Sequence, residues 1–143
     1  GQPLIGPDHH SLQVAATPTA GVAYRVRRSG GYEGLALTPD GQTAWALLEQ
    51  PLFAPGSDQP EGQFLRLLEY SVPRGEWTGR TLRFRLEPGA TAIGDFNFID
   101  ATRALIIERD NGEGDPGLAC AQGTQPTREA PCFPLPARLK RVT

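Results

Sequence analysis

The segment GYEGLALTPDGQTAWALLE, residues 31–49, decides the fold. Its two apolar runs are separated by Pro39-Asp40-Gly41, in which proline presets φ, aspartate bonds to its own backbone and glycine takes a positive φ. The segment therefore predicts a hairpin of two strands, Gly31–Thr38 and Gln42–Glu49. Because both runs are almost continuously apolar, we expect both faces of both strands to be buried.

Two more strands are expected after this hairpin. A loop rich in proline and glycine covers residues 50–62, and the apolar pattern resumes over Gln63–Val72. After a turn, Thr81–Leu86 alternates cleanly between apolar and polar residues and should be the most exposed strand. Four antiparallel strands that begin buried and end facing solvent are typical of one propeller blade.

The pattern then restarts, which indicates an internal repeat. The expected strands are Ala92–Asp100, Arg103–Glu108 and Ala137–Val142, and Val22–Arg28 reads as the last strand of a preceding unit. With a period of about 60 residues, the matched acids are Glu33 with Asp95 and Glu49 with Glu108. The sequence predicts an all-β fold of about two and a half antiparallel propeller-like blades, part of a larger propeller, because rings need four to eight blades. A smaller sandwich is the alternative.

Composition limits the partners. The 143 residues allow one domain, and 17 glycines and 14 prolines disfavour long helices. A net charge of −2 gives no field that would gather nucleic acid, so no nucleic-acid partner is expected. No apolar run is long enough for a membrane span. Because the chain contains no methionine, we expect a processed product or a piece of a longer polypeptide.

Cys120 and Cys132 lie in a loop-like stretch of glycine, proline and threonine. A disulfide between them would stabilise this apolar-poor segment by about 3 kcal/mol in the chain-entropy model. Free thiols in a reducing compartment are the alternative.

Glu33 and Asp95 stand near the starts of the two innermost strands, so a propeller would bring them to one channel mouth. Two carboxylates about 5 Å apart repel by about 3 kcal/mol at an effective dielectric near 20, which favours a bridging cation. Calcium, which takes oxygen ligands, is the predicted ion, and Asn97 is a further candidate ligand. The alternative is that both acids are turn formers or backbone caps at strand ends.

A second charged group follows the strand Arg103–Glu108. Glu108 leaves the predicted core directly beside Arg109 and Asp110, and Arg109 could grip a phosphate bidentately. The alternative is a solvated acidic loop with a structural Glu–Arg pair. His9 and His10 lie in a polar N-terminal stretch and are expected to belong to an exposed tail rather than to act as a general base.

Four blocks, in order, resemble a known family. GYEGLALTPDG with its following LEQPL, then RLLEY, IGD and LIIERDNG, are similar to the signature of the phytase-like family, also called the esterase-like activity of phytase family. The resemblance covers residues 30–115 and continues weakly into residues 138–142. It divides the chain into an N-terminal extension, residues 1–21, and a phytase-like segment, residues 22–143.

The resemblance implies an exported, periplasmic or extracellular propeller-like domain with metal-assisted phosphoester chemistry. It implies a calcium-dependent phosphoesterase acting on a small phosphorylated substrate, with metal ligands Glu33, Glu49 and Asp95 and catalytic residues Glu108, Arg109 and Asp110. A non-catalytic exported interaction or assembly subunit is the alternative, as are acids that bind only structural calcium. The family's domains are longer than this chain, so the remaining blades are expected from the same polypeptide or another chain.

Overall fold

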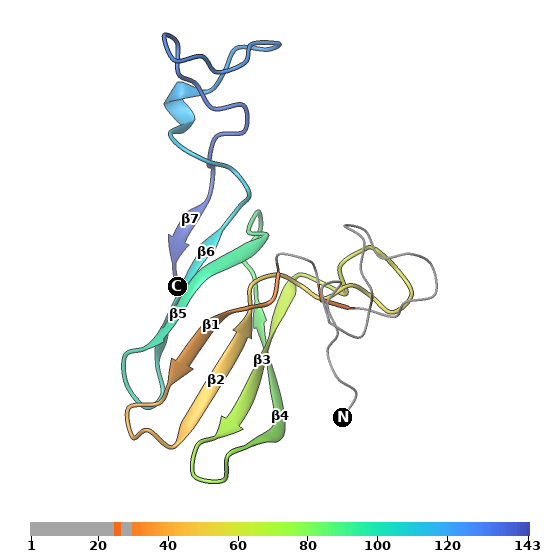
Figure 1. Cartoon of the computed structure of the whole chain (residues 1–143), viewed down its shortest axis with the longest axis vertical. Helices are drawn as coiled ribbons and strands as arrows, with labels where there is room; N and C mark the ends of the chain where they lie inside the picture. The colour runs from red at the N-terminus through yellow and green to blue at the C-terminus, as the bar shows by residue number, and fades with distance from the viewer. Residues whose placement is uncertain (1–24, 27–29) are drawn as a thin grey trace.

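The computed structural model describes residues 25–26 and 30–143 (Figure 1). These residues form two antiparallel sheets, and the all-β prediction is confirmed. The first sheet contains β1 (Tyr32–Leu37), β2 (Thr43–Leu48), β3 (Phe64–Ser71) and β4 (Glu76–Arg85), and the second contains β5 (Ala92–Phe98), β6 (Ala104–Arg109) and β7 (Lys140–Val142). The predicted extension and the strand Val22–Arg28 lie outside the described residues, apart from Arg25 and Val26, which are not in a strand.

The β1–β2 hairpin forms as its turn sequence predicts. Gly41 adopts a φ of 70°, and the carboxylate of Asp40 accepts hydrogen bonds from the backbone N–H of Gln42 at 3.0 Å and the hydroxyl of Thr38 at 2.6 Å. Next to the turn, the backbone N–H of Thr38 donates to the carbonyl of Thr43 at 2.8 Å, which is where the two strands begin to pair. The turn therefore sets the register in which β1 and β2 pair.

β3 and β4 complete the first sheet. β4 begins at Glu76, earlier than predicted, because the turn at Gly75, with a φ of 65°, returns the chain directly into pairing with β3. Nearly all of its side chains are exposed, as the alternating pattern predicted. β7 is shorter than predicted and pairs with β6 over Lys140–Val142.

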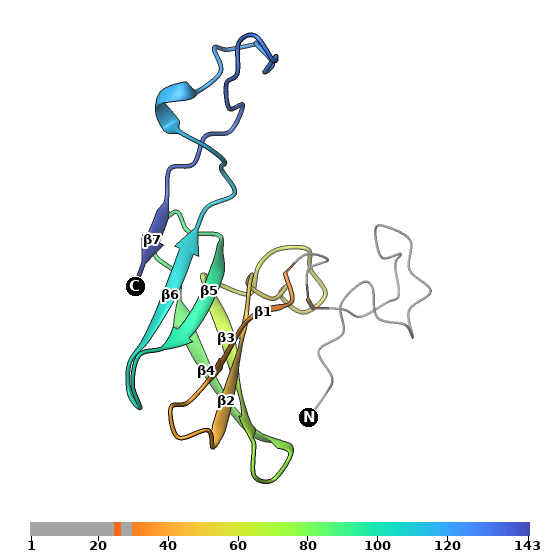
Figure 2. The same ribbon diagram turned by 60° about the vertical axis from the view of Figure 1, so that its left-hand side comes forward.

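One hydrophobic core lies between the two sheets. The face of each sheet that meets the other sheet is called its inner face, and the opposite face its outer face. Gly34 brings β1 and β5 together: a Cβ atom there would lie 2.8 Å from Cβ of Phe96 and 3.3 Å from Cδ1 of Ile93. The buried core consists of Ala36, Trp45, Leu47, Leu65, Leu86, Ala90, Ile93, Phe96 and Ile106. Figure 2 shows β5 and β6 lying across the first sheet.

The outer faces of the two sheets are only partly covered. β2 is largely buried, because Leu48 packs on its outer face beneath Val26 and Leu52. β1 alternates between buried and exposed side chains, so the prediction that both of its faces are buried is wrong for the described chain. β6 alternates in the same way. No described segment covers the outer side chains of these two strands. The two stacked sheets agree with the predicted repeat, whereas the larger propeller stays a prediction.

Both inner hairpins contain a β-bulge, and the bulges correct the sequence alignment of the repeats. In β1–β2 the register shifts between Tyr32 and Gly34, and in β5–β6 it shifts between Ile93 and Asp95. Aligning the bulges matches Gly34 with Asp95, Leu48 with Glu108 and Glu49 with Arg109. The expected matches of Glu33 with Asp95 and Glu49 with Glu108 were therefore one position out, because residue spacing does not reveal where a bulge absorbs a residue.

The segment between β6 and β7 projects away from the sheets (Figures 1 and 2). The predicted disulfide between Cys120 and Cys132 is present and closes this arm. The 3₁₀ turn η1 (Pro116–Leu118) begins where the Asp115 carboxylate accepts the Gly117 N–H at 2.7 Å. Among the described residues, no helix is long and apolar enough to cross a membrane.

Candidate functional site

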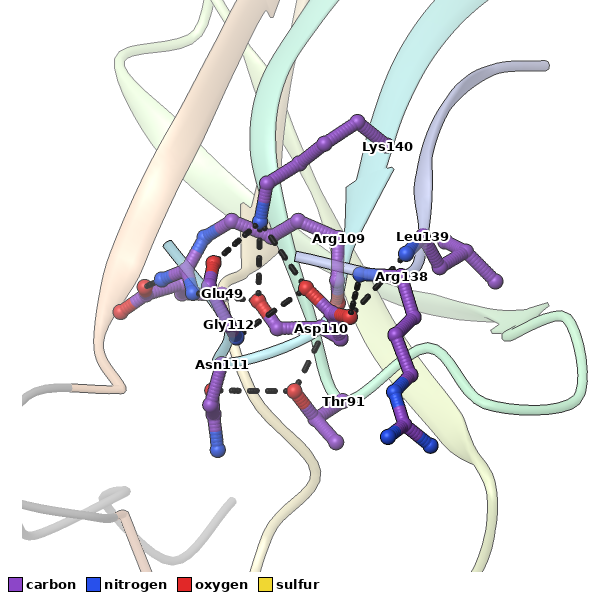
Figure 3. Close-up of polar contacts among 9 residues, drawn as sticks. All are labelled: Glu49, Thr91, Arg109, Asp110, Asn111, Gly112, Arg138, Leu139 and Lys140. Carbon is purple, nitrogen blue, oxygen red and sulfur yellow. Dashed lines mark hydrogen bonds and ion pairs between the residues drawn. The ribbon is translucent and has the colours of Figure 1, made fainter. Parts of the chain in front are cut away.

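Charged side chains gather where β2 and β6 end (Figure 3). Glu49 follows the last residue of β2, and Arg109 is the last residue of β6. Their side chains form an ion pair between the two sheets. The backbone joins the sheets at the same place, since the N–H of Ile93 donates to the carbonyl of Glu49 at 3.0 Å. Glu49 and Arg109 are both predicted site residues, and they occupy matched positions when the hairpins are aligned by their bulges. They are thus in direct contact.

The surroundings of Glu49 act on its pKa in opposite directions. Burial raises the pKa, because a carboxylate loses solvation there, whereas the charge and hydrogen bond of Arg109 lower it. The negative charge of Glu33 adds a smaller upward contribution, and the net direction is upward. Glu33 therefore lies close enough to Glu49 to influence it, although Glu33 itself is exposed on the bulge of β1.

Asp110 is held by hydrogen bonds on both carboxylate oxygens. Oδ2 accepts from the backbone N–H groups of Arg138 at 2.6 Å and Leu139 at 3.0 Å, and Oδ1 accepts from Gly112 N–H at 3.1 Å. Nζ of Lys140 donates to Oδ1 at 3.0 Å. These partners hold the pKa of Asp110 well below its usual range. Asp110 therefore fastens the end of β6 to the chain entering β7.

An open pocket of about 420 Å³ adjoins this end of the sheets. Its lining includes Gln50, next to Glu49, and Asn111, whose side-chain oxygen accepts the Thr91 hydroxyl at 3.0 Å. The complete lining is Gln50, Pro51, Pro60, Gly62, Gln63, Leu86, Ala90, Thr91 and Asn111. All of these residues are uncharged, and several have charged neighbours in the chain, among them Glu49 beside Gln50 and Asp110 beside Asn111.

Glu108 is completely buried between the sheets. Its Oε2 accepts the backbone N–H of Glu87 at 2.7 Å, and its Oε1 accepts the hydroxyl of Thr143 at 2.8 Å. Both carboxylate oxygens are therefore used inside the protein. The contacts fit a residue that joins the linker after β4 to the second sheet.

Asp95 lies on the outer face of the second sheet, opposite Ile107. Its carboxylate accepts the N–H of Phe96 at 2.7 Å and the side-chain amide of Asn97 at 2.8 Å, so these hydrogen bonds stay within β5. Asn97 thus donates its side-chain N–H to Asp95. Of the predicted metal ligands, Glu33 and Glu49 are near each other, and no contact joins Asp95 to them.

The described residues do not fit a calcium ion. Calcium takes six to eight oxygen ligands, usually with several carboxylates among them. Within residues 25–26 and 30–143, no three acidic, histidine or cysteine side chains are placed to hold a metal. The carboxylate of Glu49 is paired with Arg109, and that of Asp95 is engaged within β5. No chemistry at this end of the sheets is therefore assigned to a metal.

Sequence reasoning missed Lys140 and Thr91. Lys140 reaches from β7 to the carboxylate of Asp110 and to the carbonyl of Gly112 at 2.9 Å. Thr91 precedes β5, and its hydroxyl bonds Asn111 beyond β6. The only available signal was the predicted pairing of these strands, which brings their ends together without specifying side-chain partners.

A comparison with protein-family models supports the resemblance. The model described as "Phytase-like: Esterase-like activity of phytase" matches residues 6–130 of the 143-residue chain. The match includes β1 to β6 and most of the disulfide arm. Comparisons with curated proteins and with solved structures found no match.

Proposed function

The chain belongs to the phytase-like family, and on that premise we propose that it takes part in phosphoester hydrolysis where Glu49 and Arg109 meet. The observation that carries the proposal is this ion pair between the ends of β2 and β6, beside an open pocket. The side chain of Arg109 is 30% exposed, so part of its guanidinium is accessible. The substrate class is a small phosphorylated compound.

The proposed chemistry assigns a separate task to each charged group. Arg109 presents five N–H donors, of which one N–H group serves Glu49 and another the carbonyl of Asp110 at 3.3 Å. The remaining donors bind phosphoryl oxygens and stabilise the charge that develops on them. Glu49 orients the guanidinium. Asp110, fastened to the entry of β7, positions the backbone that follows Arg109.

Glu33 is the exposed carboxylate beside this pair, and we assign it the role of general base. It accepts a proton from a water molecule whose oxygen attacks phosphorus. The bond between phosphorus and the ester oxygen then breaks, and the leaving alkoxide takes a proton to become the alcohol. The catalytic role of Glu108 and the metal-binding role of Asp95 stay predictions, and the contacts of both carboxylates lie within the protein.

The test is phosphate release from p-nitrophenyl phosphate by the purified chain. Arg109→Gln removes the proposed phosphoryl ligand, and a loss of about 10²- to 10³-fold in kcat/KM is expected. Glu33→Gln should lower kcat, whereas Arg103→Gln, which changes an exposed arginine that pairs with Asp100, is the matched control. Unchanged turnover in both Arg109→Gln and Glu33→Gln would overturn the proposal.

Calcium dependence is tested in the same assay. Activity that survives prolonged treatment with a chelator agrees with the ligand geometry of the described residues. Activity that disappears and returns only with calcium would instead support the calcium-dependent phosphoesterase implied by the resemblance, with further ligands from residues outside the described ones.

A second candidate is a non-catalytic exported propeller segment that serves interaction or assembly. The observation that favours it is the apolar outer face of each sheet, which suits further stacked sheets from the same polypeptide or another chain. The disulfide is typical of oxidising compartments and supports a periplasmic or extracellular location. Robust hydrolysis that depends on Arg109 would eliminate this candidate.

A further inference from the structure

Each sheet leaves part of its outer face, with exposed apolar side chains, uncovered by the described residues. On the first sheet, the side chains of Leu35 and Leu37 are 69% and 54% exposed. On the second sheet, Leu105, Ile107 and Val142 are 45%, 40% and 60% exposed. Strand pairing places Ile107 directly beside Val142, so the latter three form one continuous surface. Apolar surface of this kind favours burial against a partner.

The outer face of the first sheet resembles the inner face of the second. When the two hairpins are aligned by their bulges, apolar residues occupy most matched positions on these faces, and one exception is Leu48, which matches the buried Glu108. The matches, outer face first, are Tyr32 with Ile93, Leu35 with Phe96, Leu37 with Phe98, Ala44 with Ala104 and Ala46 with Ile106. The second members of these pairs contact the first sheet within the molecule. Of the first members, Tyr32, Leu35 and Leu37 are exposed and are therefore suited to contact a sheet of the same kind, whereas Ala46 is already buried.

The converse holds for the outer face of the second sheet. Its apolar positions match inner-face positions of the first sheet: Leu105 with Trp45, Ile107 with Leu47 and Val142 with Leu67. The chain thus presents both halves of an interface that it already forms once internally. A chain that carries the two complementary halves of one interface on opposite sides associates head to tail.

The matched positions also differ in a complementary way. Asp95 stands where the first sheet has Gly34, whose nearest neighbours in the second sheet are Phe96 and Ile93. In a second copy, these neighbours correspond to Leu35 and Tyr32. Because a Cβ at Gly34 would lie 2.8 Å from the Cβ of Phe96, Asp95 requires a wider spacing between two copies than the two sheets have within one chain. At that wider spacing its carboxylate would face the hydroxyl of Tyr32. Burial raises the pKa of Tyr32 to about 12, so the hydroxyl remains a donor at neutral pH.

We propose that a second copy of this chain docks head to tail, with the outer face of its first sheet against the outer face of the second sheet of its neighbour. Asp95 of one copy then accepts a hydrogen bond from Tyr32 of the next. Because each copy contributes two sheets, about two to four copies would supply the four to eight sheets of a closed ring. The proposal rests on the sheet faces and is independent of phosphoester hydrolysis.

The test uses one blocking substitution on each face. Leu35→Asp blocks the first sheet and Ile107→Asp the second, at exposed positions where the fold should tolerate a charge. In sedimentation velocity, the wild-type chain should associate as concentration rises, and each variant alone should be monomeric. An equal mixture of the two variants retains one competent face on each chain, so it should form a 1:1 dimer and nothing larger.

Leu135→Asp is the matched control, because Leu135 is 62% exposed and belongs to the segment between β6 and β7. That segment projects away from the sheets (Figure 1). It should associate as the wild type does. A wild-type chain that stays monomeric, or a mixture that forms no dimer, would overturn the proposal. Self-association of either face variant alone would also overturn it, since that behaviour indicates an interface between identical faces.

The Asp95–Tyr32 contact is tested by a double-mutant cycle on the same association. Tyr32→Phe and Asp95→Asn should each weaken association by about three- to tenfold, and the double variant should lose little more than one of them. Losses that simply multiply would show that the two side chains do not meet and would overturn the docking register.

Discussion

The β1–β2 and β5–β6 hairpins share a strand register and a bulge at the same place, yet they bury opposite faces. The first hairpin buries Ala36 and Trp45, whereas the second exposes the matched Asn97 and Leu105 and buries Phe96 and Ile106. Because the two sheets are stacked on each other, the face that the first hairpin turns toward the core matches the face that the second hairpin turns away from it. The burial of a residue is thus decided by where its sheet lies in the stack, rather than by its hairpin alone.

The largest effect is expected where matched residues differ most in burial. Phe96→Ala should lower the free energy of unfolding by about 3–5 kcal/mol, because it opens a cavity in the core between the sheets. Leu35→Ala at the matched position should cost under about 0.5 kcal/mol, because that side chain is exposed. Urea unfolding at low protein concentration, where copies do not associate, measures both. Similar losses in the two variants would contradict the different roles of the two faces.

A second pair of matched positions differs in chemistry. Leu48 and Glu108 are both fully buried, but Glu108 accepts the Glu87 N–H and the Thr143 hydroxyl. Glu108→Leu, which makes the two hairpins alike, should cost about 1–3 kcal/mol, because the Glu87 N–H loses its partner. Urea unfolding of this variant is the measurement.

Glu108→Gln is the matched control for this substitution. Its side-chain oxygen can still accept from Glu87, and its amide can donate to the hydroxyl oxygen of Thr143. It should therefore cost less than Glu108→Leu. If leucine is tolerated better than glutamine, the hydrogen bonds of Glu108 do not hold the linker as the contacts indicate.

The sequence predicted the elements well and their burial less well. The Pro39-Asp40-Gly41 turn and the apolar runs locate β1 and β2, because local chain geometry decides both. Leu35 and Ile107 look like core residues in the sequence, since their runs are continuously apolar. Only the position of each sheet in the stack leaves them exposed, and that position depends on contacts distant in sequence.

A smaller effect is expected from the close approach of the two sheets at Gly34. Gly34→Ala would place a Cβ 2.8 Å from Cβ of Phe96 and 3.1 Å from Cβ of Leu47, so the sheets must separate slightly. We expect a loss of about 1–2 kcal/mol in urea unfolding. Gly31→Ala is the control, because a Cβ there meets no atom within 4 Å. Equal stability of the two variants would mean that β1 and β5 are not in such close contact.

The candidate site was predicted in part. The sequence pointed to Glu49, Arg109 and Asp110, because charges follow apolar strands at these places. It could not show that Glu49 binds Arg109, since one bulge in each hairpin changes which residues match. Nor could it show that Asp110 is surrounded by N–H groups of Arg138 and Leu139, because these lie beyond the disulfide arm in the sequence.

The smallest effects are expected from pH, where Glu49 and Asp110 should act with opposite signs. The pKa of Asp110 is held below its ordinary 3.8 by backbone N–H groups and Lys140, so its stabilising contribution is present above that pH and is lost as the pH falls further. Burial raises the pKa of Glu49 above its ordinary 4.5, so its contribution is full below that value and is lost as the pH rises through the raised pKa.

Urea unfolding from pH 3 to 7 separates these two contributions. The advantage of the wild type over Asp110→Asn should shrink as the pH falls, and its advantage over Glu49→Gln should shrink as the pH rises. Lys140→Met removes one donor to Asp110 but leaves the backbone donors, so it should reproduce only part of the Asp110→Asn profile. If both carboxylates instead gave profiles of the same sign, Glu49 would not be buried against Arg109. The proposed orientation of the Arg109 guanidinium by Glu49 would then lose its structural basis.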